Sequence, residues 1–223
     1  MSRASCSPPQ KQPRFITFEG GEGVGKSTQI TLLLKRLRAH DIKAIGTREP
    51  GGSHHFGPRL RTLLLSGDVR FYGTFAEALL FSVDRLYHVD EVIVPALTTG
   101  HWVVCDRYVD STRVYQGLEG DLDPMVLQAM ERIAVKNVYP HLTVLLDLCP
   151  RLGLARARQR NGNHGDRFES QDLTFHERIQ AAFLRNSERE HERTVVISVE
   201  ECPAEIVAEK VWSEVEKRFL KSA

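Results

Sequence analysis

The feature that most constrains this chain is a glycine-rich stretch near its start, Gly20-Gly21-Glu22-Gly23-Val24-Gly25-Lys26-Ser27, followed by Thr28. The stretch fits G-x-x-x-x-G-K-[ST], the pattern of a phosphate-binding P-loop. Its glycines let the backbone wrap closely around a phosphate and turn the N–H groups inward. Because the pattern arises by accident in roughly one per cent of chains this long, we predict that these residues bind a nucleotide.

The residues on either side favour the strand and the helix that a P-loop requires. Before it, Phe15 to Glu19 is a β-branched and aromatic run of strand length. After it, apolar residues recur at helical spacing, at Ile30, Leu33, Leu34 and Leu37. The start of that helix would place partial positive charge beside the phosphates. Lys26 would reach the β- and γ-phosphates, and the Ser27 hydroxyl would bind Mg²⁺.

The composition narrows the class of protein. With 223 residues, 41% of them apolar and 26% charged, the chain has the make-up of one ordinary globular domain. Its net charge of +1 is too balanced for a nucleic-acid-binding surface. No apolar run is long enough to cross a membrane. We therefore expect neither a nucleic acid nor a membrane as a partner. The four cysteines lack C-x-x-C spacing, which predicts reduced thiols and a cytoplasmic location rather than a zinc site or a disulfide framework.

The first residues differ in character from the rest. Residues 1–13 are polar, contain three prolines and lack the apolar segment of a secretory signal. We predict that they form a disordered tail. No repeat or long linker divides the remainder of the chain, so residues 14–223 are expected to form a single domain.

Apolar runs and breaks predict an alternation of strands and helices. Strands are expected at 42–46, 102–105, 142–146 and 195–197, and helices at 60–65 and 74–97, the latter with a bend near Pro95. Pro150 suits the first turn of another helix, and Val207, Val211, Val215 and Phe219 mark one row of a C-terminal helix. The prediction is an α/β fold with a parallel β-sheet flanked by helices.

In such a sheet, the loops at the carboxyl ends of the strands share one crevice. Asp106 and Asp147 each end an apolar strand, so each is a candidate partner of Mg²⁺, and the residues alone do not separate them. A second phosphate could be clamped by arginines near these loops, namely Arg48, Arg61, Arg85 and Arg107. A surface ion pair is the alternative for any one of them.

The densest basic cluster follows the last of these loops and comprises Arg151, Arg156, Arg158, Arg160 and Arg167. On a helix, Arg156 and Arg160 stand four residues apart and repel each other unless an anion lies between them. The stretch Asn161-Gly162-Asn163-His164-Gly165 follows, and its glycines and asparagines favour a mobile segment. We therefore predict a basic lid at about 156–170 that closes over polyphosphate. The alternative is ion pairing with Asp166, Glu169 and Asp172.

At this point the chain resembles the bacterial thymidylate kinases, which are P-loop nucleoside monophosphate kinases. The resemblance rests on five stretches in the family's order: residues 18–20 with the P-loop, Thr47-Arg48-Glu49-Pro50-Gly51-Gly52, Leu80-Phe81-Ser82-Val83-Asp84-Arg85, Asp106-Arg107-Tyr108 through Tyr115-Gln116-Gly117, and Asp166-Arg167-Phe168-Glu169. It spans residues 15 to about 190. The second and fourth stretches are far more specific than a P-loop alone.

The resemblance implies transfer of the γ-phosphate of ATP to dTMP, giving dTDP and ADP, with Mg²⁺ and in a homodimer. It favours Asp106 over Asp147 as the residue beside the metal, together with Ser27. It also implies that the P-loop binds ATP. The catalytic residues that it implies are Lys26, Arg107, Arg156, Arg160 and Arg167.

The resemblance also implies which residues contact the phosphate and the sugar of dTMP. Arg48, Arg61 and Arg107 would hold the phosphate. Glu22 would lie near the sugar 3′-OH or the metal. Tyr115 would lie against the sugar, where a ribose 2′-OH would collide.

For the thymine base, the resemblance implies stacking on Phe81. Arg85 and Gln116 would hydrogen-bond the polar edge of the ring, and Thr112 would lie near it. Glu169 is a weaker candidate for a metal or sugar contact.

The chain departs from the family pattern in two places near the expected dTMP pocket, at His54-His55-Phe56 and at Arg113-Val114. Some relatives also carry an arginine in the P-loop where Gly23 stands here. This chain therefore resembles the class whose catalytic arginines come from the lid.

Two other functions remain open. The chain could be a P-loop kinase for a different monophosphate or a small alcohol. Phe81, Arg85 and Gln116, which would face the base, would distinguish between these acceptors. It could instead be an ATPase or nucleotide switch that acts through a partner. Against that, Phe18-Glu19 stands where partition-type ATPases carry a lysine, and no Asn-Lys-x-Asp stretch reads guanine.

Overall fold

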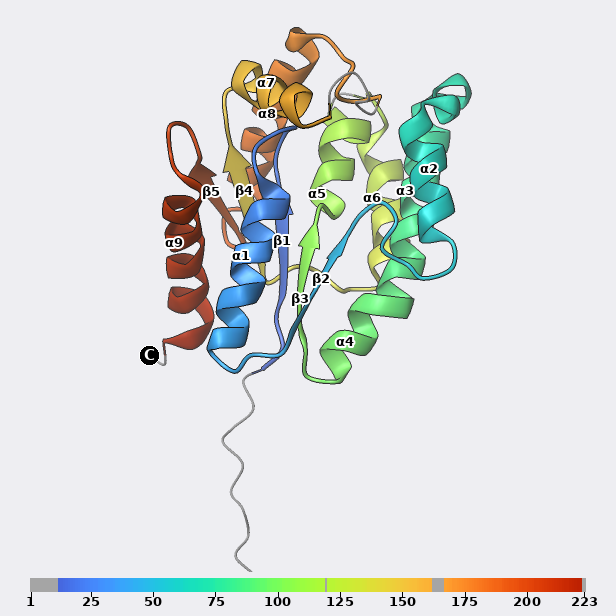
Figure 1. Ribbon diagram of the computed structural model, residues 1–223. Helices are drawn as coiled ribbons and strands as arrows, with labels where there is room; N and C mark the ends of the chain where they lie inside the picture. The colour runs from blue at the N-terminus through green and yellow to red at the C-terminus, as the bar shows by residue number, and fades with distance from the viewer. Residues whose placement is uncertain (1–11, 119, 162–166, 222–223) are drawn as a thin grey trace, which may run out of the picture.

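The computed structural model describes residues 12–118, 120–161 and 167–221 (Figure 1). Five parallel strands form one sheet in the order β2-β3-β1-β4-β5. The strands are β1 (Phe15–Glu19), β2 (Ala44–Arg48), β3 (Trp102–Asp106), β4 (Leu142–Asp147) and β5 (Thr194–Ser198). The predicted α/β class is thereby confirmed. Of the predicted tail, residues 1–11 lie outside the described part of the chain.

Strand β2 differs from its predicted bounds. It begins at Ala44 and ends at Arg48, so the predicted bounds of 42–46 are wrong at both ends. Pairing with β3 sets these ends, because Arg48 lies in register with Asp106. Arg48 therefore lies at the carboxyl edge of the sheet, beside the metal candidate.

Helices cover both faces of the sheet (Figure 1). They are α1 (Lys26–Ala39), α2 (Gly57–Ser66), α3 (Gly73–His88), α4 (Val94–Thr98), α5 (Val109–Thr112), α6 (Pro124–Val135), α7 (Pro150–Asn161), α8 (Leu173–Arg189) and α9 (Ala204–Val215). A 3₁₀ helix, η1 (Asp68–Tyr72), and three π-helical segments, η2 (Val89–Ile93), η3 (Arg113–Leu118) and η4 (Glu216–Leu220), connect or extend them. The predicted helix at 74–97 falls within α3, η2 and α4, with Pro95 in the first turn of α4.

Alternate residues of the central strands enter different hydrophobic clusters. Trp102 and Val104 of β3 pack with α1 and α9 on one face, where the predicted row at Val207, Val211 and Val215 lies. Val103 and Cys105 of the same strand pack with η2, α5 and the end of α6 on the other face. Both faces of β3 are therefore buried, as its unbroken apolar run predicts.

Helices α6 and α8 were not among the predicted elements, although each carries a start signal. Asp123 accepts a hydrogen bond from the backbone N of Met125 at 2.7 Å, and Asp172 accepts one from Phe175 N at 2.7 Å. An aspartate at this position satisfies an N–H group of the first turn. No helix among the described residues is long and apolar enough to cross a bilayer.

Candidate active site

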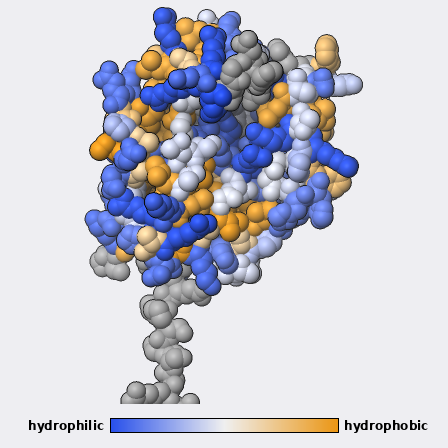
Figure 2. Space-filling view, viewed as in Figure 1, coloured by the Kyte–Doolittle hydropathy of each residue, from blue (hydrophilic) through white to orange (hydrophobic). Residues whose placement is uncertain are grey.

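A cavity of about 610 Å³ opens at the carboxyl edge of the sheet. Hydrophilic side chains surround the hollow in the upper part of this face (Figure 2). Every residue predicted to contact dTMP lines the cavity, as do Ser27, Asp106 and the P-loop from Glu22 to Thr28. The fold therefore brings these separate stretches to one place.

The P-loop packs directly against the start of α7. Gly23 has a φ of 69°, and a Cβ at this position would lie 1.9 Å from the carbonyl oxygen of Gly153. A Cβ on Gly153 would in turn lie 2.3 Å from the oxygen of Glu22. The two backbones touch, so position 23 leaves no room for the arginine that some relatives carry there.

The side chains at the phosphate end are held by the backbone and by one another. Lys26 Nζ donates to the carbonyl oxygens of Gly20 at 3.0 Å and Gly21 at 2.8 Å. Burial, and next the charge of Arg107, lower the pKa of Lys26. An anion in the cavity would offset that repulsion.

Asp106 is suited to a metal ion. Its Oδ2 accepts from Ser27 Oγ at 3.2 Å. Its Oδ1 is buried and has no hydrogen-bond partner among the described residues. No group of three His, Cys, Asp or Glu side chains in the described ranges could hold a metal alone. One carboxylate and one hydroxyl fit Mg²⁺, which keeps several waters and takes other ligands from substrate phosphates.

A strained turn follows Asp106. Arg107 has a φ of 67°, a value that non-glycine residues rarely adopt. Buried Glu19 stabilises this turn by accepting from Tyr108 N at 2.8 Å and Ser111 Oγ at 2.6 Å. Burial first, and then the charge of Asp110, raise the pKa of Glu19 to about 7.

The turn directs Arg107 into the cavity. Its Nη2 donates to Glu22 Oε1 at 2.6 Å and its Nη1 to Ser111 Oγ at 3.1 Å. Burial raises the pKa of Glu22, but the charges of Arg107 and Lys26 outweigh it and leave the pKa lowered. Arg107 thus joins the P-loop to the turn after β3.

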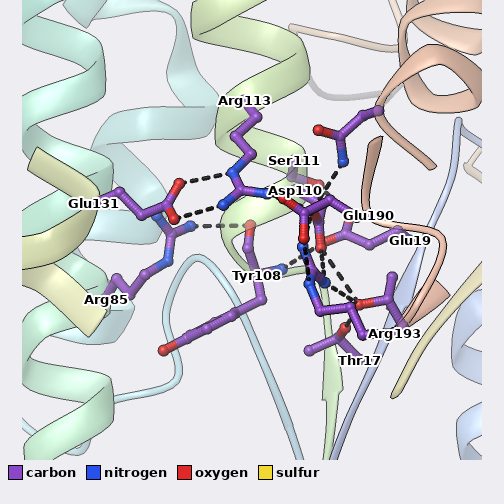
Figure 3. Close-up of polar contacts among 12 residues, drawn as sticks. Thr17, Glu19, Arg85, Tyr108, Asp110, Ser111, Arg113, Glu131, Glu190 and Arg193 are labelled. Atoms are coloured by element: carbon purple, nitrogen blue, oxygen red, sulfur yellow. Dashed lines mark hydrogen bonds and ion pairs between the residues drawn. The ribbon is translucent and has the colours of Figure 1, made fainter. Parts of the chain in front are cut away.

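A partly buried polar network supports the other side of this turn (Figure 3). Arg193 donates to both oxygens of Asp110, at 2.8 and 2.7 Å. Arg113 donates to both oxygens of Glu131 at 2.7 Å and to Glu190 at 2.6 Å. This network accounts for one departure from the family pattern, because Arg113 ends among these acids and does not line the cavity.

The other departures also lie away from the cavity lining. Val114 is fully buried against α8. His54 lies on the surface, where its backbone N donates to Glu91 at 2.8 Å, and the ring of Phe56 lies 5.3 Å from that of Tyr87. The cavity is therefore formed without these residues.

At the end of the cavity away from the P-loop, Arg85 is almost completely buried. Its Nε donates to Glu49 Oε2 at 2.8 Å, and its Nη2 donates to the oxygen of Tyr108 at 3.1 Å and to Thr112 Oγ1 at 3.0 Å. His88 lies 2.9 Å from the other oxygen of Glu49. Glu49 is thus the acid that fixes Arg85. The sequence reasoning missed this role, although Glu49 stands in a stretch that carries the resemblance.

The predicted lid arginines occupy three different environments. Arg160 lines the cavity and pairs with Glu169 at 3.2 Å. Arg156 is exposed on α7 and is not part of the cavity lining. Arg167 pairs with Glu77 at 2.5 Å and also lies outside the lining. Residues 162–166 of the predicted lid are outside the described part of the chain.

The rival metal candidate, Asp147, has a different partner. Its Oδ1 accepts from Gln180 Nε2 at 2.7 Å, and it does not line the large cavity. The geometry of the described residues therefore favours Asp106.

A parallel sheet with a P-loop, and a second group of cationic and aromatic side chains facing it across one cavity, defines a P-loop phosphotransferase. The model of the family described as thymidylate kinase matches residues 18–211. Similar proteins include the thymidylate kinase of Nitrobacter winogradskyi, 46% identical over 221 residues that cover 99% of this chain and 95% of the relative. That of Rhodopseudomonas palustris is 47% identical over 94% of this chain and 91% of the relative. The thymidylate kinase of Magnetococcus marinus is 44% identical over 95% of this chain and 99% of the relative.

The chain belongs to the thymidylate kinase family. The resemblance drawn from the five sequence stretches is thereby confirmed.

Proposed function

We propose that this protein is an ATP-dependent dTMP kinase that transfers the γ-phosphate of ATP to dTMP, giving dTDP and ADP. The observation that carries the proposal is the single cavity that combines a P-loop at one end with Phe81, Arg85 and Gln116 at the other. A nucleoside triphosphate bound by the P-loop and a pyrimidine monophosphate bound beside Phe81 would meet with their phosphates between the two ends.

The chemistry at the phosphates requires charge neutralisation rather than a base. A phosphate monoester is already largely dianionic at neutral pH, because its second pKa is about 6. The barrier lies in bringing two anions together and holding them in line. Lys26 would exchange its carbonyl partners for the β- and γ-phosphates of ATP, and the P-loop N–H groups would hold the same phosphates.

The metal ion is proposed to be Mg²⁺, held by Ser27 and Asp106. The unsatisfied Oδ1 of Asp106 supports this assignment. When bound, Mg²⁺ supplies neutralisation of the charge on the β- and γ-phosphates.

The acceptor would be oriented by contacts with all three of its parts. Arg48, Arg61 and Arg107 hold its phosphate, and Glu22 lies beside the sugar 3′-OH or the metal. The guanidinium of Arg107 lies 5.5 Å from the ring centre of Tyr115. The Tyr115 ring would thus lie next to the phosphate and block a ribose 2′-OH.

The base would stack on Phe81, with Thr112 beside it and Arg85 and Gln116 at its polar edge. Arg85 and Gln116 are both nearly completely buried. An unpaired group there would be costly, and this supports discrimination among bases.

The lid arginines would complete the site when ATP is bound. Arg160 faces the cavity, and Arg156 stands one turn before it on α7. Both would neutralise charge on the transferred phosphate, and closure would exclude water. Glu169 already lines the cavity beside Arg160, and Arg167 would add its positive charge from beside Glu77.

The protein is further proposed to act as a cytoplasmic homodimer. Phe75 and Leu79 lie one turn apart on α3 and are both about half exposed, and Phe71 of η1 is 92% exposed. Helices α2 and α3 lie side by side at the edge of the molecule (Figure 1). An apolar surface of this kind is typical of an interface with a second copy of the chain. The described cysteines are unpaired, as suits a reducing compartment.

The test is ADP release measured in parallel with dTMP, dUMP, dCMP and AMP as acceptors. We expect turnover with dTMP, some with its close analogue dUMP, and little with the other two. Preference for dCMP or AMP would overturn the assignment. ATP turnover that ignores all four and requires a protein or DNA partner would instead identify a nucleotide switch.

A further inference from the structure

Glu77 is a buried acid that the proposed chemistry does not use. It lies on the same face of α3 as Phe81 and Arg85, because the three residues are spaced four apart. Glu77 is 9% exposed. Its Oε1 accepts from Gln116 Nε2 at 2.5 Å, and its Oε2 lies 2.5 Å from Arg167 Nη2. Both oxygens are thus engaged by residues from distant parts of the chain.

The contact with Gln116 fixes which end of its amide faces the ligand. A carboxylate can only accept hydrogen bonds, so the amide must turn its Nε2 toward Glu77. Within the described ranges no group donates to Gln116 Oε1, although the side chain lines the cavity. The amide oxygen is therefore the group that Gln116 presents to a base.

Arg85 has the opposite polarity. Within the described part of the chain, its hydrogen bonds to Glu49, Tyr108 and Thr112 use Nε–H and Nη2. The Nη1 amino group has no partner there and is left for a ligand. The base end of the cavity thus offers a donor from Arg85 and an acceptor from Gln116. Thymine and uracil carry an acceptor at O4 and a donor at N3–H, which match this pair. Cytosine carries a donor at N4 and an acceptor at N3, which oppose it.

We propose that Glu77 is a positioning residue that sets the hydrogen-bond polarity of Gln116 and thereby selects a pyrimidine with a hydrogen on N3. The inference rests on the proposed function, since it requires Gln116 to contact the base. It adds a residue that contacts no substrate and acts only by fixing one amide.

Arg167 strengthens the same arrangement. It comes directly after residues 162–166 of the predicted lid, and its side chain lies beside Gly67, where an added Cβ would be 3.7 Å from Arg167 Cδ. Its guanidinium occupies Oε2 of Glu77, so Gln116 is left with Oε1. Arg167 and the base-reading amide of Gln116 are therefore joined through one carboxylate.

The experiment compares Glu77→Gln with Glu131→Gln. Glu131 is a matched control, because it is also 9% exposed and bound to an arginine, yet it does not line the cavity or touch Gln116. For each variant, kcat and KM are measured with dTMP and with dCMP, and the midpoint of thermal unfolding is recorded.

A glutamine at position 77 can donate as well as accept, so it no longer fixes the amide of Gln116. We expect Glu77→Gln to raise KM for dTMP about tenfold with little change in kcat, and to lower the preference for dTMP over dCMP by about tenfold. Glu131→Gln should lower the unfolding midpoint without changing the preference for dTMP over dCMP. Glu77→Asp keeps an acceptor-only group, so it should bind dTMP more weakly and retain the base preference.

Three results would overturn the inference. One is a base preference in Glu77→Gln equal to that of the wild type, and another is an equal loss in Glu131→Gln. The third is an unchanged preference in Gln116→Ala, which would remove that residue from the base. If Gln116→Ala loses the preference and Glu77→Gln keeps it, only the role of Glu77 fails and the dTMP kinase assignment stands. Failure of the wild type to use dTMP would overturn the proposed function itself.

Discussion

The two ends of the cavity are built in different ways. At the phosphate end, one contiguous stretch of backbone forms the cradle, and Lys26 bonds carbonyl groups five and six residues away in the chain. At the base end, Arg85 and Gln116 are fixed by Glu49 and Glu77, which are 36 and 39 residues away in the chain. The first end depends on backbone conformation and the second on buried carboxylates.

This difference predicts how each end fails. A change at the phosphate end removes charge that acts on the reacting atoms, so it should lower kcat. A change in a supporting acid at the base end should disturb the ground-state and transition-state contacts with dTMP alike, so it should raise KM.

The largest effect is expected for Lys26→Ala. Losing the cation beside the β- and γ-phosphates should lower kcat by about two to three orders of magnitude. Thermal unfolding should show a folded protein, because the residue mainly bonds nearby carbonyl groups. Near-normal turnover would remove the P-loop lysine from the chemistry.

The next effect is expected for the double variant Arg156→Ala with Arg160→Ala. If these arginines neutralise the transferred phosphate, kcat should fall about a hundredfold while the calorimetric affinity for dTMP changes little. Arg151→Ala, at the exposed start of the same helix, is the control. A change in thermal stability alone would instead assign Arg160 to its ion pair with Glu169.

At the base end, Glu49→Gln should raise KM for dTMP by about tenfold or more, because Arg85 loses a charged partner that orients it. Breaking this buried pair should also destabilise the fold, by about 3 kcal/mol or more. Asp90→Asn, which weakens an exposed pair with Lys136, is the control. A fall in kcat at unchanged KM would contradict the division between the two ends.

The smallest effect concerns Glu19, which lies beneath the turn that joins the two ends. Its pKa is raised from 4.5 to about 7 in the folded protein, so the folded protein holds this proton more tightly than the unfolded chain does. Its contribution therefore favours folding at low pH and is lost as pH rises from about 4.5 through about 7.

Urea unfolding of the wild type and of Glu19→Gln at several pH values measures this contribution. The wild type should lose on the order of 1 to 3 kcal/mol more than the variant across that window. Asp110, Arg107 and Ser111 face the same carboxyl group, so all remain unchanged in the comparison. Parallel pH profiles would show that Glu19 does not carry the effect.

The same division explains how much the sequence could predict. The P-loop, the strand before it and the helix after it are neighbours in the chain, so local pattern and chemistry were enough to find them. The family resemblance then supplied the arginines and the aromatic residues, and all nine predicted dTMP contacts line the cavity.

The supporting acids could not be found in this way, because their role depends on which side chains the fold brings within hydrogen-bond distance. Nothing in the sequence around Glu77 or Glu49 distinguishes either residue from an ordinary surface glutamate. The bounds of β2 were missed for a similar reason, since pairing with β3 extends the strand to Arg48. Helices α6 and α8 could have been predicted, because Asp123 and Asp172 are recognisable N-cap residues in the sequence.

The contact between Gly23 and Gly153 has a consequence for how such enzymes can diverge. A side chain at either position would push α7 away from the nucleotide, and α7 carries Arg156 and Arg160. A single mutation that introduced a cation at position 23 would therefore displace the arginines of α7. The resulting enzyme would have neither a well-placed P-loop cation nor well-placed lid arginines. The two ways of supplying positive charge exclude each other sterically, so a lineage that began with one would need coordinated changes in both segments to reach the other.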